Sequence, residues 1–168
     1  MDKTSGVQAL IVAGSLLISA SAALAEDNAV DWKALQQAKV SLQKGLDAAG
    51  GSGKPISGKF EVENGALQLS TYTASKGKYF EIIVDHKSGK IAKTEEIKEG
   101  EDLTHATEQA KAMATAKKSL SSAVSRAVGA NKGYRAVSAI PSLEDGKPVA
   151  RIVLESAKGT RTVTEKLY

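Results

Sequence analysis

The chain has 168 residues, of which 42% are hydrophobic and 25% charged, and its formal net charge is +4. This composition is that of a globular protein of one to one-and-a-half average domains, and it argues against wholesale disorder. Cysteine is absent, which excludes disulfides, thiolate metal ligands and a cysteine nucleophile, and two histidines leave little room for histidine-based chemistry.

The first 25 residues have the pattern of a secretory signal peptide. Lys3 supplies a positive start, residues 9–18 form a short apolar stretch, and residues 23–25 read Ala-Leu-Ala, a cleavage signal of the A-x-A type. We therefore expect an exported, periplasmic chain that begins at Glu26. An uncleaved membrane anchor is the alternative, although the stretch is short for a span of about 20 apolar residues.

Two segments have the periodicity of amphipathic helices. Residues 31–49 carry an apolar residue at every third or fourth position, and Asp31 is the expected N-cap. Residues 104–128 repeat the pattern, with Thr104 as the expected cap and Gly129 at the C-terminal end. Each segment is therefore predicted to form one continuous helix.

Strand and turn signals follow each helix. Asn64-Gly65 separates two alternating segments and predicts a tight hairpin, because both central residues of its turn have φ > 0. Gly146 and Gly159 mark two turns in the second half, and Asp85 and Gly89 bound a turn in the first. The expected strands are 56–62, 66–72, 79–85 and a short edge strand at 90–95, then 134–140, 149–155 and 160–166.

The order of a helix followed by strands occurs twice, which indicates an internal repeat. The helices align from Ser41 to Ser119, an offset of 78 residues, whereas the strand ends align from Gly89 to Gly159, an offset of 70. On this alignment the first copy carries eight more residues than the second. The expected linker is 97–102, which divides the chain into a signal peptide (1–25), a first module (26–98) and a second module (99–168).

The strand that ends in Asp85, the Lys-Ser-Gly-Lys turn around Gly89 and the Asn64-Gly65 hairpin together resemble the PepSY domain. That family occurs in propeptides of thermolysin-type metalloproteases and in small exported bacterial proteins. The second half matches less closely, with Glu155 in place of the aspartate. The resemblance implies an α+β fold of two tandem PepSY-like modules, each one helix packed on a small antiparallel sheet of three to four strands. It also implies a role in holding or inhibiting peptidases, without catalytic residues.

Two further features could carry chemistry. Asp85-His86-x-Ser88 could suggest a nucleophile with its base, but neighbours in a tight turn point apart, and Asp85 is expected to cap the turn through its own backbone. His86 and His105 would form a metal site only with carboxylates brought in by folding. We therefore predict no catalytic residue, no metal site and no cofactor.

The last strand of each expected module is the place where a partner could bind. A small open sheet leaves unpaired backbone groups at its edge, and these can accept an extended peptide by strand addition. Pairing of the two modules with each other is the alternative. Residues 101–168 hold 11 Lys and Arg against 7 Asp and Glu, which suits an acidic partner or simply a solvated face. The predicted partner-binding residues are Lys90, Lys93, Arg151 and Arg161.

The sequence thus predicts a periplasmic, non-enzymatic binding protein with a protein partner, a peptidase being the class that the resemblance suggests. Nucleic acid is not expected as a partner, nor is stable membrane insertion after the leader is removed. The alternative is an envelope sensor or structural protein that binds an ion or anionic ligand through the basic second module. The predicted structural turns contain Asn64, Gly65, Asp85, Gly89, Gly146 and Gly159.

Overall fold

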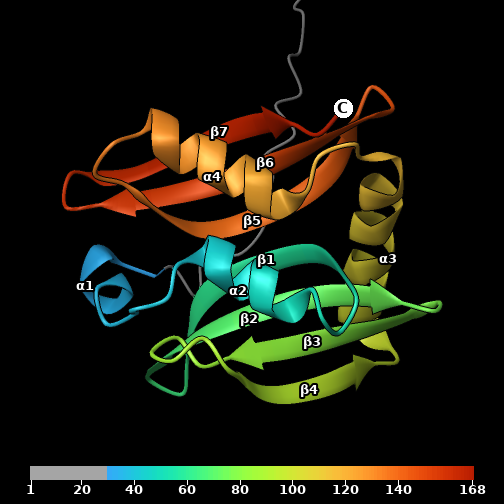
Figure 1. Cartoon of the computed structure of the whole chain (residues 1–168), viewed down its shortest axis with the longest axis horizontal. Helices are drawn as coiled ribbons and strands as arrows, with labels where there is room; N and C mark the ends of the chain where they lie inside the picture. The colour runs from blue at the N-terminus through green and yellow to red at the C-terminus, as the bar shows by residue number, and fades with distance from the viewer. Residues whose placement is uncertain (1–29) are drawn as a thin grey trace, which may run out of the picture.

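The structure is a computed structural model that describes residues 30–168, so the predicted signal peptide lies outside the described residues. Four helices and seven strands follow one another along the chain (Figure 1). The first half contains α1 (Trp32–Leu35), α2 (Leu42–Ala49), β1 (Lys54–Glu63), β2 (Ala66–Ser75), β3 (Lys78–Val84) and β4 (Ile91–Ile97). The second contains α3 (Gly100–Thr115), α4 (Leu120–Ala130), β5 (Arg135–Glu144), β6 (Lys147–Ser156) and β7 (Gly159–Lys166).

All seven strands belong to one antiparallel sheet with the order β4-β3-β2-β1-β5-β6-β7. The prediction of two tandem modules, each with its own sheet of three to four strands, is therefore wrong. The sheet is continuous because β1 and β5 pair at its centre, where Gly58 lies opposite Ala139 and Lys59 opposite Ser138. The last strands β4 and β7 lie at the two outer edges of the sheet (Figure 1).

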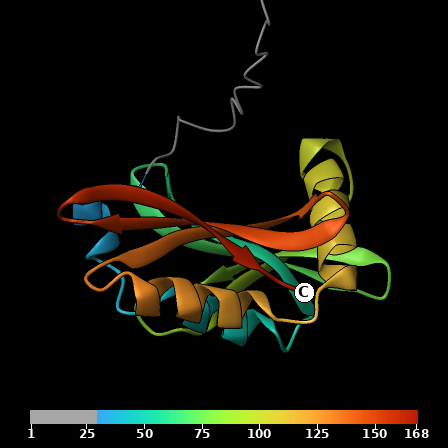
Figure 2. The same ribbon diagram turned by 90° about the horizontal axis from the view of Figure 1, so that it is seen from above.

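Two of the helices share one face of the sheet. In Figure 2, α2 and α4 lie on the same side of the strands, here named the helix face, whereas α3 stands at one end and extends beyond the other side. The hydroxyl of Ser57, on β1, is 2.6 Å from the side-chain oxygen of Gln109, so α3 covers that end of the opposite, open face. The core lies between the helices and the sheet. A Cβ at Gly58 would lie only 3.0 Å from Leu46 of α2.

Both predicted long helices are broken in two. In the first half, helix α2 begins anew after Ser41. Ser41 is its N-cap, because the Ser41 hydroxyl accepts the N–H of Lys44. The N–H groups of Lys39 and Val40 both donate to the carbonyl of His86, which satisfies them outside any helix. The second break has the same construction, with Ser119 as the N-cap of α4 and with Lys117 and Lys118 donating to the carbonyl of Leu167. The expected cap Thr104 instead lies inside α3.

The same order of elements occurs twice within the one sheet, but in a different alignment from the expected one. β5, β6 and β7 each begin 81 residues after β1, β2 and β3, as Lys54 and Arg135 show. The helix caps repeat at 78 residues, and the difference of three residues equals the extra length of α4, which has 11 residues against 8 in α2. The alignment of Gly89 with Gly159 is therefore wrong, because β3 corresponds to β7. β4 has no counterpart.

Two basic side chains tie the halves together. Arg135, the first residue of β5, donates to the carbonyls of Leu35 at 2.7 Å, Ala38 at 3.0 Å and Val40 at 3.4 Å, where α1 ends. Its counterpart Lys54, the first residue of β1, donates to the carbonyl of Met113 near the end of α3. Arg135 of the second half thus contacts the end of α1 in the first half, and Lys54 of the first half contacts α3 in the second. These contacts add to the β1–β5 pairing that joins the halves.

Candidate binding surfaces

The predicted partner-binding residues do not form one site. Lys90 and Lys93 lie beside and on β4, at one edge of the sheet, and Arg161 lies on β7, at the other. Arg151 lies on β6, next to β7. All four are exposed, so they line two separate edges.

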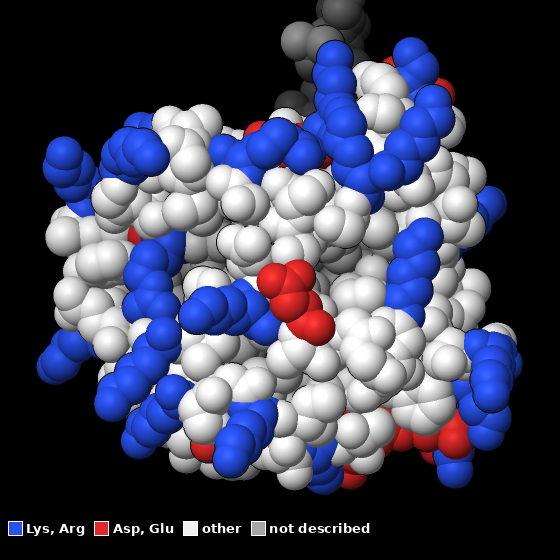
Figure 3. Space-filling model, viewed as in Figure 1, with Lys and Arg blue, Asp and Glu red and all other residues white. Residues whose placement is uncertain are grey.

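Several basic residues of the second half are engaged within the chain. Arg161 donates to the side-chain oxygen of Asn131 at 2.6 Å and lies 4.8 Å from the centre of the Tyr134 ring. Arg126 forms an ion pair with Glu165 at 2.9 Å. Figure 3 shows Lys and Arg side chains spread over the helix face and around its rim rather than gathered in one patch. This arrangement does not favour a single anion site in the second half.

The outer edge of β7 presents free backbone groups. In an antiparallel hairpin with a two-residue turn, the pair that flanks the turn is hydrogen-bonded, and bonded and non-bonded pairs then alternate. Ser156 and Gly159 flank the turn between β6 and β7, so Thr160, Thr162 and Thr164 belong to the non-bonded pairs. Their N–H and C=O groups therefore point away from β6. Within residues 30–168, no strand lies beyond β7.

The corresponding edge of β3 is covered. Tyr79, Glu81 and Ile83 are the counterparts of the three threonines, and they pair with Ile97, Glu95 and Lys93 of β4. The structure thus contains the same edge in two states, one covered by an antiparallel strand and one open. At the end of β7, the carbonyl of Lys166 already accepts hydrogen bonds from Lys118 and Arg126, which limits the open edge to the three threonines.

A network of polar side chains lies on the open face of the first half. Glu61 accepts hydrogen bonds from Ser70 at 2.7 Å and from Lys59 at 2.6 Å, and the hydroxyl of Tyr72 donates to Glu81 at 3.2 Å. Burial raises the pKa of Tyr72 above its usual value, and the negative charges of Glu81 and Glu61 raise it further. Sequence reasoning missed this network, because its members come from three strands and meet only through the register.

The turn at Asp85 is structural. One carboxylate oxygen of Asp85 accepts the N–H groups of Lys87 and Ser88, both at 2.8 Å, and these bonds lower the pKa of Asp85. The carboxylate therefore holds its own turn and does not orient His86 as a catalytic base. In the described part of the chain, no three His, Asp or Glu side chains are grouped as a metal site would require. Residues 30–168 also contain no helix with the length and apolarity needed to cross a membrane.

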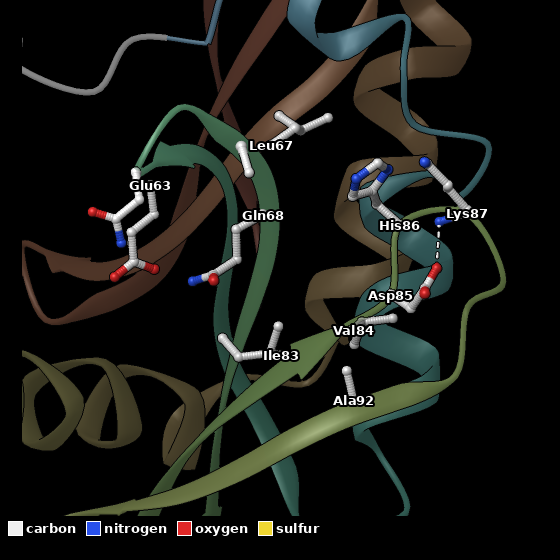
Figure 4. A pocket seen from close by; sticks show the side chains of 11 residues that line it. Glu63, Leu67, Gln68, Ile83, Val84, Asp85, His86, Lys87 and Ala92 are labelled. Atoms are coloured by element: carbon white, nitrogen blue, oxygen red, sulfur yellow. Dashed lines mark hydrogen bonds between the residues drawn. The ribbon is translucent and has the colours of Figure 1, made fainter.

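A cavity of about 410 Å³ opens beside this turn, where the ends of β2 and β3 separate. We call it the notch. Figure 4 shows His86 and Lys87 on one side of it, Glu63 on the other, and Leu67 and Ile83 between them. The Nδ1 atom of His86 is buried and has no hydrogen-bond partner. The lining of the notch is a mixture of polar and apolar groups in about equal parts.

Comparisons with protein-family models, with curated proteins and with solved structures found no match to this chain. The resemblance to the PepSY domain therefore stays a prediction.

Proposed function

We propose that this chain is an exported, non-catalytic binding protein of the cell envelope, and that the outer edge of β7 takes up an extended segment of a protein partner. One observation carries the proposal. The backbone groups of Thr160, Thr162 and Thr164 face outwards, whereas the equivalent groups of β3 are paired with β4. An incoming segment would add an eighth strand in the place that β4 occupies in the other half.

The pairing of β3 with β4 serves as a template for this interaction. The segment would run antiparallel to β7 and would pair with the three threonines as Ile97, Glu95 and Lys93 pair with β3. Backbone bonds contribute only about 1 kcal/mol each in net terms, and the segment must be ordered on binding. Specificity must therefore come from side chains, for which exposed Arg151 is available one strand away.

The leader sequence supports export, and the PepSY resemblance suggests a peptidase as the partner. An ion-binding or anion-binding role through the basic second half has less support, because Arg126, Arg135 and Arg161 already bind groups of this chain.

A proline placed on the edge tests the proposal. Thr162→Pro removes an N–H that points outwards and leaves the bonds to β6 in place, which edge strands tolerate. Thr162→Val keeps the N–H and changes only the side chain. Thr94→Pro removes the N–H of a residue on β4, at the opposite edge, that belongs to a pair not bonded to β3.

The measurement is affinity capture from a periplasmic extract, followed by hydrogen exchange of the purified complex. We expect the wild-type chain, Thr162→Val and Thr94→Pro to capture the same protein, and Thr162→Pro to lose it. The amides of Thr160, Thr162 and Thr164 should gain protection in the complex. Capture that survives Thr162→Pro in a folded variant, or protection that falls elsewhere, would overturn the proposal.

A further inference from the structure

The C-terminal ends of β3 and β7 occupy equivalent places in the two halves. Only after β7 does a further backbone hydrogen bond join the chain to the neighbouring strand. After β7, the N–H of Leu167 donates to the carbonyl of Pro148 at 3.0 Å, and the Leu167 side chain is completely buried. His86 stands 81 residues earlier, at the corresponding place after β3. Its carbonyl accepts two N–H groups ahead of α2, just as that of Leu167 does ahead of α4.

The bond that closes the second half is missing from the first. No hydrogen bond joins the N–H of His86 to the carbonyl of Leu67, which is the counterpart of Pro148. The pairing of β2 with β3 ends at Leu69 and Val84. Beyond that pair the two strand ends separate, and the notch occupies the gap.

Unpaired backbone groups face the notch. Leu67 lies opposite Val62, next to the bonded pair that flanks the Asn64-Gly65 turn, so its own pair with β1 is a non-bonded one. The N–H and C=O groups of Leu67 therefore point away from β1, towards the side that β3 has left. A strand edge with unpaired backbone groups can accept an extended peptide by strand addition.

The other walls of the notch define what fits. Ile83 and Ala92 provide an apolar surface, and Glu63 and Lys87 lie on opposite sides of the opening (Figure 4). A volume of about 410 Å³ holds a few residues of extended peptide. In the second half, the equivalent place is filled by peptide backbone and by a leucine side chain.

We infer that the notch binds an extended peptide unit with an aliphatic side chain. Its N–H and C=O would bond to the C=O and N–H of Leu67, and its side chain would pack on Ile83 and Ala92. The unit could be part of a longer protein segment or a free short peptide whose ammonium and carboxylate meet Glu63 and Lys87. This site goes beyond the function proposed above, because it lies in the first half of the sheet and not on β7.

The test is a titration of the ¹⁵N-labelled chain with two probes, free Ala-Leu-Ala and its N-acetylated, C-amidated form, followed by amide chemical shifts. We expect shifts confined to the amides of the notch, with those of Leu67 and His86 foremost. Equal binding of both probes would identify a segment of a longer protein as the ligand, because the capped probe has the same backbone and side chains as the free peptide but no charged termini. Binding of the free form alone would identify a free short peptide.

The matched variants are His86→Leu and His105→Leu. His86→Leu introduces leucine, the residue at the equivalent position 167. It should fill the notch and lower the affinity for the probe peptides at least about tenfold. The second changes the other histidine, which is exposed on α3, and should leave binding unchanged. Absence of shifts with both probes, shifts spread over other surfaces, or undiminished binding by His86→Leu would overturn the inference. The wild-type shift map tests it even if His86→Leu fails to fold.

Discussion

Removal of the Arg135 side chain should destabilise the whole protein, although Arg135 lies far from α1 in the sequence. Arg135→Ala removes the donors for three carbonyls at the end of α1 and its connection to α2. Hydrogen bonds from a charged group contribute about 1.5–3 kcal/mol each in net terms. One of the three is long at 3.4 Å, and the guanidinium is partly desolvated, which lowers its pKa. We therefore expect a loss of about 3 kcal/mol.

The assay is urea unfolding followed by circular dichroism, with thermal unfolding as a second measurement. For a domain of this size, a loss of about 3 kcal/mol corresponds to a fall in Tm of about 10 °C. Arg135→Lys should lose about half as much, because lysine at the corresponding position, Lys54, makes one such bond. Arg151→Ala is the control, since Arg151 is an exposed arginine of the neighbouring strand and should change stability by less than about 0.5 kcal/mol.

Equal stability of Arg135→Ala and Arg151→Ala would refute the reasoning, because it would mean that the contact between β5 and α1 adds nothing to the fold. The comparison of unfolding free energies also requires that every variant unfolds in a single transition. Two transitions in the wild-type chain would show that the halves unfold separately, in conflict with the ties at Arg135 and Lys54.

Two further predictions concern the sheet. The folded-state pKa of Tyr72 is raised above its unfolded value of 10.0, so its contribution to stability is present below pH 10 and is lost as the pH rises further. The stability of the wild-type chain should therefore fall more steeply with pH above 10 than that of Tyr72→Phe, by up to about 1.4 kcal/mol per pH unit in denaturant titrations; parallel profiles would contradict this. Gly65 has a φ of 79° in the β1–β2 turn, and Gly65→Ala should lower the unfolding free energy by about 1 kcal/mol. Gly51→Ala is its control, because a Cβ at either glycine meets nothing within 4 Å but only Gly65 has a positive φ. An equal loss in both variants would count against the turn as the cause.

Local chemistry made part of this fold predictable. The Asn64-Gly65 turn and the strands on either side follow from short-range signals, and the edge strand at 90–95 corresponds to β4. The helix breaks were missed because the apolar period continues through Ser41 and Ser119. Only the carbonyls of His86 and Leu167, more than 40 residues away, explain why the chain bends there.

The long-range features could not be predicted from one sequence. No local pattern specifies that β1 pairs with β5, since the ladder between them contains only two residue pairs. The repeat was misaligned because the ends of β3 and β6 share a similar run of apolar residues. The outer strands were foreseen as candidate edges, but the notch was not. It becomes visible only when His86 is compared with Leu167 on the alignment that the structure provides.

The pairing of Gly58 with Ala139 relates each strand to its own counterpart, since the two residues are 81 positions apart. The halves are thus arranged about an approximate two-fold axis. The contacts between them come from β1, β5, α2 and α4, and also from α1 and α3, in addition to the covalent link between Ile97 and Gly100. A protein built in this way is suited to fragment complementation. Cleavage of the backbone at that link would leave two polypeptides whose mutual recognition is already encoded in their surfaces.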